Sequence, residues 1–371
     1  MPYGTLQADT VADSYNASLA PISVPFRNRI INGAMVIDQR NAGAAQINIT
    51  SPAWICDRFQ FLTSQNSKWS LQQLPVTDLA GYNNSAYVTI STTYTTGASD
   101  FALVEHKIEG FNSADFAWGT ANAKPVTLSF WVKTNVVGTY GVTVLNSATN
   151  RAYCTTYSVA SSGAWTQATI TIPGDTSGTW LTNNGIGIWL RFSLGAGSTY
   201  AFPTPNTWGT TIGYQPSGGA VISGNAGGYW QFTGVQLEKG SNATSFDYRP
   251  YGTELSLCQR YYWQMGKDIA YSNFGNGFSG SATINYLDLP LKQTMRVVPT
   301  LVTTGTASNY QILLGLSAIA LSVVPTIDAL NSNTDIVLIA STVATGLTAG
   351  QGGLLRANNT TSAFLGFNSE L

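Results

Sequence analysis

Short runs of alternating apolar and polar residues, separated by turn residues, constrain the fold of this chain more than any other feature. The alternation is regular at 126–133 and 186–192, and a third run at 168–172 ends at Pro173-Gly174. A side-chain period of two is that of a β-strand with one apolar face and one mixed face. The same pattern predicts further strands at 57–63, 69–75, 86–94, 101–110, 139–145, 152–159 and 229–237.

The number and shortness of these segments predict an all-β protein. About ten short strands with no long helix between them are typical of a two-sheet sandwich of jelly-roll type, which we expect over residues 28–250. The 37 glycines and 14 prolines supply the turns that so many short strands require.

Residues 195–228 interrupt the alternation with a stretch rich in Gly, Pro, Ser and aromatic residues. We expect a long loop there, and such loops are usually functional or form interfaces.

The regions on either side of the jelly roll have different patterns. Residues 1–27 are polar and irregular and contain Pro21 and Pro25, so we expect a short irregular N-terminal arm. Residues 251–266 are expected to connect two domains, partly through a short helix that carries Glu254, Leu255, Leu257, Cys258, Tyr261 and Tyr262. Alternation then returns at 281–289, 296–303, 310–314, 318–323, 334–340 and 362–367. A second, smaller C-terminal β domain is therefore predicted over 267–371.

The low charge of the chain excludes several classes of partner. Only 9% of the residues are charged, against about 25% in an average soluble protein, and the formal net charge is −1. No run of Lys or Arg is present, so a nucleic acid partner is not expected. The longest apolar stretches are too short and too interrupted to insert into a membrane. The first residues lack the basic start and apolar core of a signal peptide.

The residues that usually carry catalysis are sparse. The three cysteines, Cys56, Cys154 and Cys258, stand far apart and are expected to be buried apolar residues rather than disulfides or metal ligands. His106 is the sole histidine, and we expect it to be a structural residue of its strand. No catalytic residue, metal site or cofactor is predicted, and we expect a protein that is not an enzyme.

Two alternatives remain open at this point. A glycosidase needs only two carboxylates, and the candidates are Asp57, Asp78, Asp100, Glu105, Glu109, Asp115, Glu238 and Asp247. Structural calcium prefers oxygen ligands, which Asp78, Asn83, Asn84, Asp115 and Asp247 could supply without any fixed spacing.

The aromatic content suggests a binding surface. Trp, Tyr and Phe make up 12% of the chain, and flat rings stack on the apolar faces of sugars while short polar side chains bond to hydroxyl groups. Alternation places Trp131, Lys133, Trp189 and Arg191 on the face opposite the aliphatic core. The candidate glycan-binding residues are Trp208, Tyr214, Tyr229, Trp230, Trp189 and Arg191. The alternative is a subunit interface, because exposed Trp and Tyr also mark contacts between subunits.

Several stretches, taken in order, resemble a known family. They are RIINGAMVIDQRNAG at 29–43, WICDRF at 54–59, VQLEKG at 235–240, FDYRPYGTEL at 246–255, CQRYY at 258–262, LRANN at 355–359 and AFLGFNSEL at 363–371. Together they resemble tail-fibre and related appendage proteins of bacteriophages, with a central part similar to a carbohydrate-binding-module-like jelly roll. The stretch 236–262 is the most specific part.

The resemblance implies a virion protein, made in the host cytoplasm, that forms a homotrimer and touches a glycan on the host surface. It also implies that residues 1–27 attach the protein to other phage virion proteins. Fibres of this kind usually begin with a larger attachment domain and a shaft, whereas only about 27 residues precede the jelly roll here. Either residues 1–27 attach the protein directly or another protein supplies the shaft, so tail fibre, head fibre and capsid-decoration roles stay open. A purely structural protein and a glycan depolymerase are the alternatives to a receptor-binding appendage.

Overall fold

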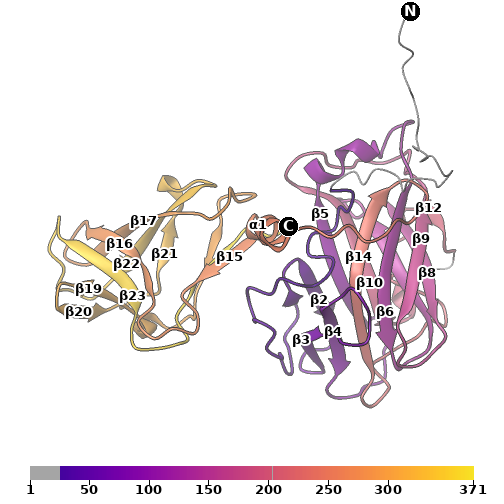
Figure 1. Ribbon diagram of the computed structural model, residues 1–371, viewed down its shortest axis with the longest axis horizontal. Helices are drawn as coiled ribbons and strands as arrows, with labels where there is room; N and C mark the ends of the chain where they lie inside the picture. The colour runs from indigo at the N-terminus through magenta and orange to yellow at the C-terminus, as the bar shows by residue number, and fades with distance from the viewer. Residues whose placement is uncertain (1–25, 203) are drawn as a thin grey trace, which may run out of the picture.

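The chain folds into two all-β lobes joined by a short helix (Figure 1). This computed structural model describes residues 26–202 and 204–371. The predicted arm therefore lies outside the described residues, apart from Phe26 and Arg27. No helix of the described chain is long and apolar enough to cross a membrane.

The larger lobe is a sandwich of two antiparallel sheets, as the alternation predicts, and the all-β jelly-roll class is confirmed. The seven-stranded sheet has the order β1 (Ala53–Cys56), β2 (Phe59–Thr63), β5 (Phe101–Glu109), β10 (Ile186–Ala196), β7 (Gly138–Leu145), β8 (Ala152–Val159) and β12 (Thr207–Gly209). The five-stranded sheet has the order β3 (Trp69–Pro75), β4 (Asn84–Ile90), β14 (Tyr229–Lys239), β6 (Val126–Thr134) and β9 (Thr166–Ile172).

Aromatic rings from both sheets fill the space between them. Phe192 of β10 lies 5.1 Å from Phe130 of β6 and 5.4 Å from Phe232 of β14, measured between ring centroids. Phe59 of β2 also meets Phe232, at 5.4 Å and nearly edge to face. All four rings are essentially inaccessible to solvent. Burying a side chain of this size stabilises the fold by about 2–3 kcal/mol, so this cluster holds the two sheets together.

The predicted loop over 195–228 is more ordered than its composition suggests. It contains β11 (Ala201–Phe202) and β13 (Gln215–Pro216), which pair in parallel, as well as β12. The segment crosses the outer face of the seven-stranded sheet, where Thr143 donates to the Gly213 carbonyl at 2.5 Å and Ser193 donates to Gln215 at 2.9 Å. Its glycines and prolines therefore serve close packing on a sheet and not a free loop.

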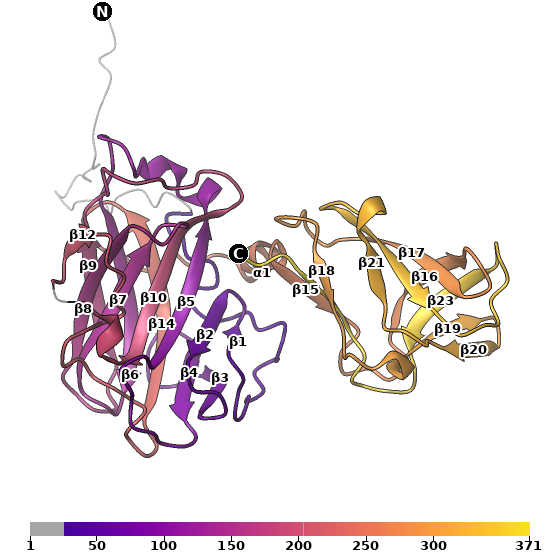
Figure 2. The same ribbon diagram turned by 180° about the vertical axis from the view of Figure 1, so that it is seen from behind.

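The smaller lobe contains a second pair of sheets, seen from behind in Figure 2. A three-stranded sheet has the order β15 (Tyr262–Met265), β24 (Leu365–Asn368) and β18 (Thr300–Val302). A seven-stranded sheet has the order β20 (Ser317–Ala320), β19 (Tyr310–Leu314), β23 (Gly352–Ala357), β16 (Asn273–Ser279), β17 (Ile284–Pro290), β22 (Ile336–Thr342) and β21 (Thr326–Asp328). Alternation did not predict β15, β16, β21 or β23. Glycines dilute the pattern in β16 and β23, and the other two strands are too short to show one.

The helix expected between the domains is present as α1 (Tyr251–Gln259). Cys258 of this helix and the following Tyr261 pack against Ile31 and Ile37 of the sandwich. The next strand, β15, pairs with β24 and so belongs to the smaller lobe.

Ion pairs near the C-terminal residues fasten the two lobes to each other. Glu370 accepts hydrogen bonds from Arg58 and, at 3.1 Å, from Arg40, which both belong to the sandwich. The Arg40 guanidinium also lies 3.6 Å from Asp57, which is 1% exposed. Burial raises the pKa of the Asp57 carboxyl to about 6, against the opposing attraction of Arg40. The lobe contact therefore contains a carboxyl group that titrates near neutral pH.

This titration predicts that acid strengthens the contribution of Asp57. The folded-state pKa lies above the unfolded value of 3.8, so the folded chain binds the proton more tightly as the pH falls through about 6. Between pH 7 and pH 5, the unfolding free energy of the wild type should rise relative to Asp57→Asn by about 1 kcal/mol. Urea unfolding of both proteins at the two pH values measures this difference. A constant difference would show that Asp57 keeps an ordinary pKa.

Candidate functional site

Three tryptophans from separate parts of the sequence meet at one end of the sandwich. The ring centroid of Trp118 lies 4.7 Å from that of Trp180 and 5.3 Å from that of Trp208, and Trp180 and Trp208 are 5.5 Å apart. All three pairs are close to edge to face, which is a favourable geometry for aromatic rings. We call these residues the tryptophan cluster.

Two connecting segments carry Trp118 and Trp180 and are bonded to each other. Trp118 follows two short 3-10 helices, η1 (Gly110–Asn112) and η2 (Ala114–Phe116), and Trp180 lies between β9 and β10. Backbone hydrogen bonds link the segments: Gly110 N–H donates to the Gly185 carbonyl at 2.8 Å, and Phe111 N–H donates to the Asn183 carbonyl at 3.0 Å. The two connections therefore form one bonded unit above the core.

A buried carboxylate holds the Trp180 segment in place. Asp175 is 1% exposed and accepts two hydrogen bonds from Arg151, at 2.9 Å and 2.6 Å. The same carboxylate accepts from the Ser177 backbone N–H at 3.1 Å and from Trp180 Nε1 at 3.3 Å. This set of bonds satisfies the buried charge and orients the Trp180 ring.

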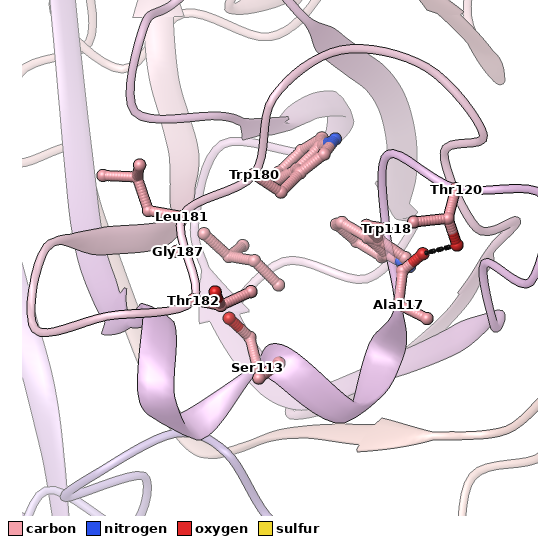
Figure 3. A pocket seen from close by; sticks show the side chains of 10 residues that line it. Ser113, Ala117, Trp118, Thr120, Trp180, Leu181, Thr182 and Gly187 are labelled. Carbon is pink, nitrogen blue, oxygen red and sulfur yellow. Dashed lines mark hydrogen bonds between the residues drawn. The ribbon is translucent and has the colours of Figure 1, made fainter.

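A cavity of about 270 Å³ opens between these two segments (Figure 3). The rings of Trp118 and Trp180 face it, together with the hydroxyl-bearing residues Ser113, Thr120 and Thr182. None of its described lining residues carries a charge. Gly187 also lines the cavity, and a Cβ atom there would lie 2.3 Å from Ser113 Oγ. A larger residue would therefore push into the wall, so this position requires glycine.

The polar N–H groups of both indole rings are bonded within the chain. Trp118 Nε1 donates to the Lys124 carbonyl at 2.7 Å, and Trp180 Nε1 donates to Asp175 and to the Ser177 carbonyl. The indole donors are thus used within the chain. The Thr120 hydroxyl donates to the Ala117 carbonyl at 2.7 Å, and the Ser113 hydroxyl donates to the Gly110 carbonyl at 3.4 Å. Apolar ring surface, the Thr182 hydroxyl and the acceptor capacity of Ser113 are left for a ligand.

One of the six predicted ligand-binding residues lies in the tryptophan cluster. Trp208 sits in β12, packs on Tyr153 at 5.2 Å and donates from Nε1 to the Pro173 carbonyl at 2.8 Å. Its ring packs against those of Trp118 and Trp180 but does not line the cavity.

Three more of the predicted residues gather on the outer face of the seven-stranded sheet. Trp189 Nε1 and Arg191 Nε both donate to Glu105 Oε2, at 2.8 Å and 3.2 Å. The Arg191 guanidinium lies 4.0 Å from the Trp189 ring and donates to the Tyr214 hydroxyl at 3.3 Å. Tyr214 stacks on Tyr200 at 4.6 Å. The polar groups of this cluster are mostly bonded to one another, and Arg191 is only 8% exposed.

The remaining two predicted residues are neighbours on β14 that point to opposite faces of the five-stranded sheet. Tyr229 lies on the outer face beside Tyr87, at 5.6 Å. Trp230 is 0% exposed, and its Nε1 donates to the buried Tyr157 hydroxyl at 2.9 Å. The assignment of Trp230 as a ligand-binding residue is wrong, because this ring belongs to the core between the sheets.

The prediction that Trp131, Lys133, Trp189 and Arg191 share one face of the protein also needs a correction. Trp131 and Lys133 lie on β6 of the five-stranded sheet, whereas Trp189 and Arg191 lie on β10 of the other sheet. All four face away from the core, but they do so on opposite sides of the sandwich.

Trp118 and Trp180 were missed by the sequence analysis. Both occur in short segments without alternation, FAWG at 116–119 and SGTW at 177–180. A search for tryptophans outside the predicted strands would have found them, because a large apolar ring in a polar turn needs a particular packing partner.

The groups considered for catalysis are engaged in structural contacts. Burial and the nearby Arg58 charge lower the pKa of His106 well below its usual value, and its Nδ1 lies 3.1 Å from the Arg58 carbonyl. The carboxylates are paired or hydrogen-bonded in most cases, as for Glu109 with Arg260 and Asp115 with Lys239. All three cysteines are free and buried, as predicted. Within the described residues, no group of three or more His, Cys, Asp or Glu side chains could hold a metal ion.

Comparisons with known proteins give only weak likenesses to solved structures. No family model matches the chain, and no curated protein matches it. A solved structure of the carbohydrate-binding module CBM4 is 14% identical, with a TM-score of 0.28, over 57% of this chain and 99% of that one. The module TmCBM61, solved with β-1,4-galactotriose, is 10% identical with a TM-score of 0.31, over 58% of this chain and 99% of that one. The enzymatically active domain of bacteriophage CBA120 tailspike protein 4 is 11% identical with a TM-score of 0.28, over 58% of this chain and 22% of that one. At such scores, the assignment of the fold rests on the sheets described above.

The hydrogen bonds between Asp175 and Arg151 predict that removing the Arg151 side chain destabilises the fold strongly. In Arg151→Met the buried carboxylate loses its cation, and the unfolding free energy should fall by about 3 kcal/mol. Tryptophan emission should also shift to the red as the Trp180 segment loosens. Arg29→Met is the matched control, since the Arg29–Asp115 pair nearby is more exposed and should contribute less than about 1 kcal/mol. Equal effects of the two substitutions would contradict this role of Asp175.

Proposed function

We propose that the protein binds glycans and that the cavity between Trp118 and Trp180 takes a neutral sugar unit. The observation that carries this proposal is the combination of two tryptophan rings and three hydroxyl-bearing residues around one uncharged cavity. Sugars have apolar C–H faces that pack on aromatic rings, and their hydroxyl groups exchange hydrogen bonds with Ser and Thr.

The size and rigidity of the cavity support this proposal. Its volume of about 270 Å³ is near the lower end of the range for small-ligand pockets, which suits a short saccharide rather than a large cofactor. Hydrogen bonds within the chain hold both indole rings in place, so little conformational entropy is lost when a ligand binds.

The wider role that we propose is that of a phage virion appendage, such as a tail fibre, which displays the cavity toward the host surface. The sequence stretches that resemble phage appendage proteins support this role. A homotrimer fits it, because several weak sites on one particle bind a surface more tightly than a single site. Attachment to other virion proteins through residues 1–27 is part of the same proposal.

The sugar site predicts a specific loss in Trp180→Ala. Removing one ring face should weaken binding to immobilised neutral oligosaccharides at least tenfold, equivalent to about 1.4 kcal/mol, as measured on a glycan array and by calorimetry. The matched control is Trp165→Ala, which removes a half-buried tryptophan directly before β9. Its Nε1 also donates to an aspartate, Asp78, in the connection between β3 and β4. The control should bind like the wild type.

Three outcomes would contradict the proposal. If no neutral glycan binds, the cavity between Trp118 and Trp180 is not a sugar site. If Trp180→Ala binds normally, the sugar lies elsewhere on the protein. If mass spectrometry shows shortened glycans, the protein is a depolymerase.

The proposed trimer can be tested independently by measuring the mass of the protein in solution. Light scattering should give about three times the mass of one chain. We propose the outer face of the C-terminal seven-stranded sheet as the contact, because it exposes Phe278 (52%) and Ile336 (43%). Phe278→Asp should therefore yield monomers, whereas Phe111→Asp should remain trimeric, because Phe111, which is also more than half exposed, lies in the sandwich lobe. A wild-type monomer at every concentration would exclude the trimer.

A further inference from the structure

A second cavity, of about 290 Å³, lies where the two lobes meet. Arg40 and Trp54 of the sandwich line one side, and Tyr262, Gln264, Lys267 and Asn368 line the side of the smaller lobe. It shares no lining residue with the cavity of the tryptophan cluster. We call it the interlobe cavity.

Arg40 forms a rigid part of the wall of this cavity. Its guanidinium carbon lies 3.6 Å from the ring centroid of Tyr262 and 4.3 Å from that of Trp54, so the cation stacks with a ring from each lobe. The charge is balanced within the chain by Glu370 at 3.1 Å and Asp57 at 3.6 Å. Arg40 therefore orients the aromatic walls and has little charge left for a ligand.

Lys267, unlike Arg40, has a charge that is available to a ligand. Its Nζ donates to the Arg40 carbonyl at 2.6 Å, which places the ammonium group beside the cavity. In the described chain, no carboxylate lies within 4.0 Å of this ammonium group, whereas Lys107, Lys133 and Lys239 each have one. An ammonium group has three donors, so two remain after the carbonyl bond.

Two side-chain amides add donors to the same wall. The Tyr262 hydroxyl donates to Gln264 Oε1 at 2.8 Å, and the Glu370 backbone N–H donates to Asn368 Oδ1 at 3.4 Å. Because each amide oxygen is engaged, the NH₂ group is the part left to bond a ligand. No acidic residue is among the described lining residues.

We propose that the interlobe cavity binds a saccharide unit that carries a carboxylate. Lys267 would pair with the carboxylate, and the amides of Gln264 and Asn368 would donate to its oxygens or to neighbouring hydroxyls. Trp54 and the nearby Phe364 supply apolar surface for the sugar ring. One unpaired cation suits a single negative charge and is too little for a nucleic acid, whose binding requires several cations.

This site stands apart from the proposed neutral-sugar site. A ligand in it would contact both lobes, so its binding energy would add to the stability of the lobe contact. The two sites can therefore be tested separately, by affinity for charged and uncharged sugars and by interlobe stability.

The experiment compares matched acidic and neutral sugars on the full chain. The probes are trigalacturonate against its methyl ester, and sialyllactose against lactose, titrated by calorimetry at low salt. We expect at least one acid to bind tenfold or more tightly than its neutral partner and to raise the melting temperature. Lys267→Gln should abolish this preference, and Lys267→Arg should retain part of it.

Two controls separate this site from other effects. Lys292→Gln removes an exposed lysine of the same lobe and should leave the preference intact. The proposal is overturned if neither acid is preferred, if Lys267→Gln binds as the wild type does, or if Lys292→Gln has the same effect as Lys267→Gln. It is also overturned if the acidic peptide triglutamate binds as tightly as the sugar acids, since the site would then recognise charge alone.

Discussion

The packing of aromatic rings between the two sheets of the sandwich is the constraint on which the rest of this structure depends. Phe59, Phe130, Phe192 and Phe232 come from four different strands and meet within about 5 Å of one another in successive pairs. This packing sets the spacing of the sheets, and so determines where each connection between strands leaves the core. The tryptophan cluster can form because the connections after β5 and β9 emerge at the same end.

Arginine–carboxylate pairs position both of the proposed ligand sites. Asp175 and Arg151 hold the segment that carries Trp180, and Glu370 and Asp57 hold Arg40 between two rings. In a chain with only 9% charged residues, few such pairs are available, and these lie close to cavities. Planar guanidinium groups suit this use, since they bond to carboxylates along their edge and stack on rings with their face.

The two cavities are both proposed to bind saccharides, but their lining residues differ in chemistry. The cavity at the end of the sandwich is lined by tryptophan rings and hydroxyl-bearing residues without charge. The interlobe cavity has a ring, amide donors and one lysine without a carboxylate partner in the described chain. Surface polysaccharides often contain both neutral and acidic units, so two such sites on one chain would select a composition rather than a single sugar. The contact between the lobes is essential to the second site, because each lobe supplies only part of its lining.

The sequence by itself determined most of the longer strands and therefore the all-β class. Alternation located β3, β8 and β19 at their exact bounds, because the side-chain period of a strand is local and a polar face is easily distinguished from an apolar one. It could not decide the inner face of β14, where Tyr229 and Trp230 are adjacent aromatic residues and either could point inward. Only the pairing of β14 with β4 and β6 decided that Trp230 is buried. The tryptophan cluster was likewise a product of the tertiary structure. Trp118, Trp180 and Trp208 are distant in sequence and meet only through backbone hydrogen bonds and strand pairing between their segments, and no local pattern records contacts of that kind.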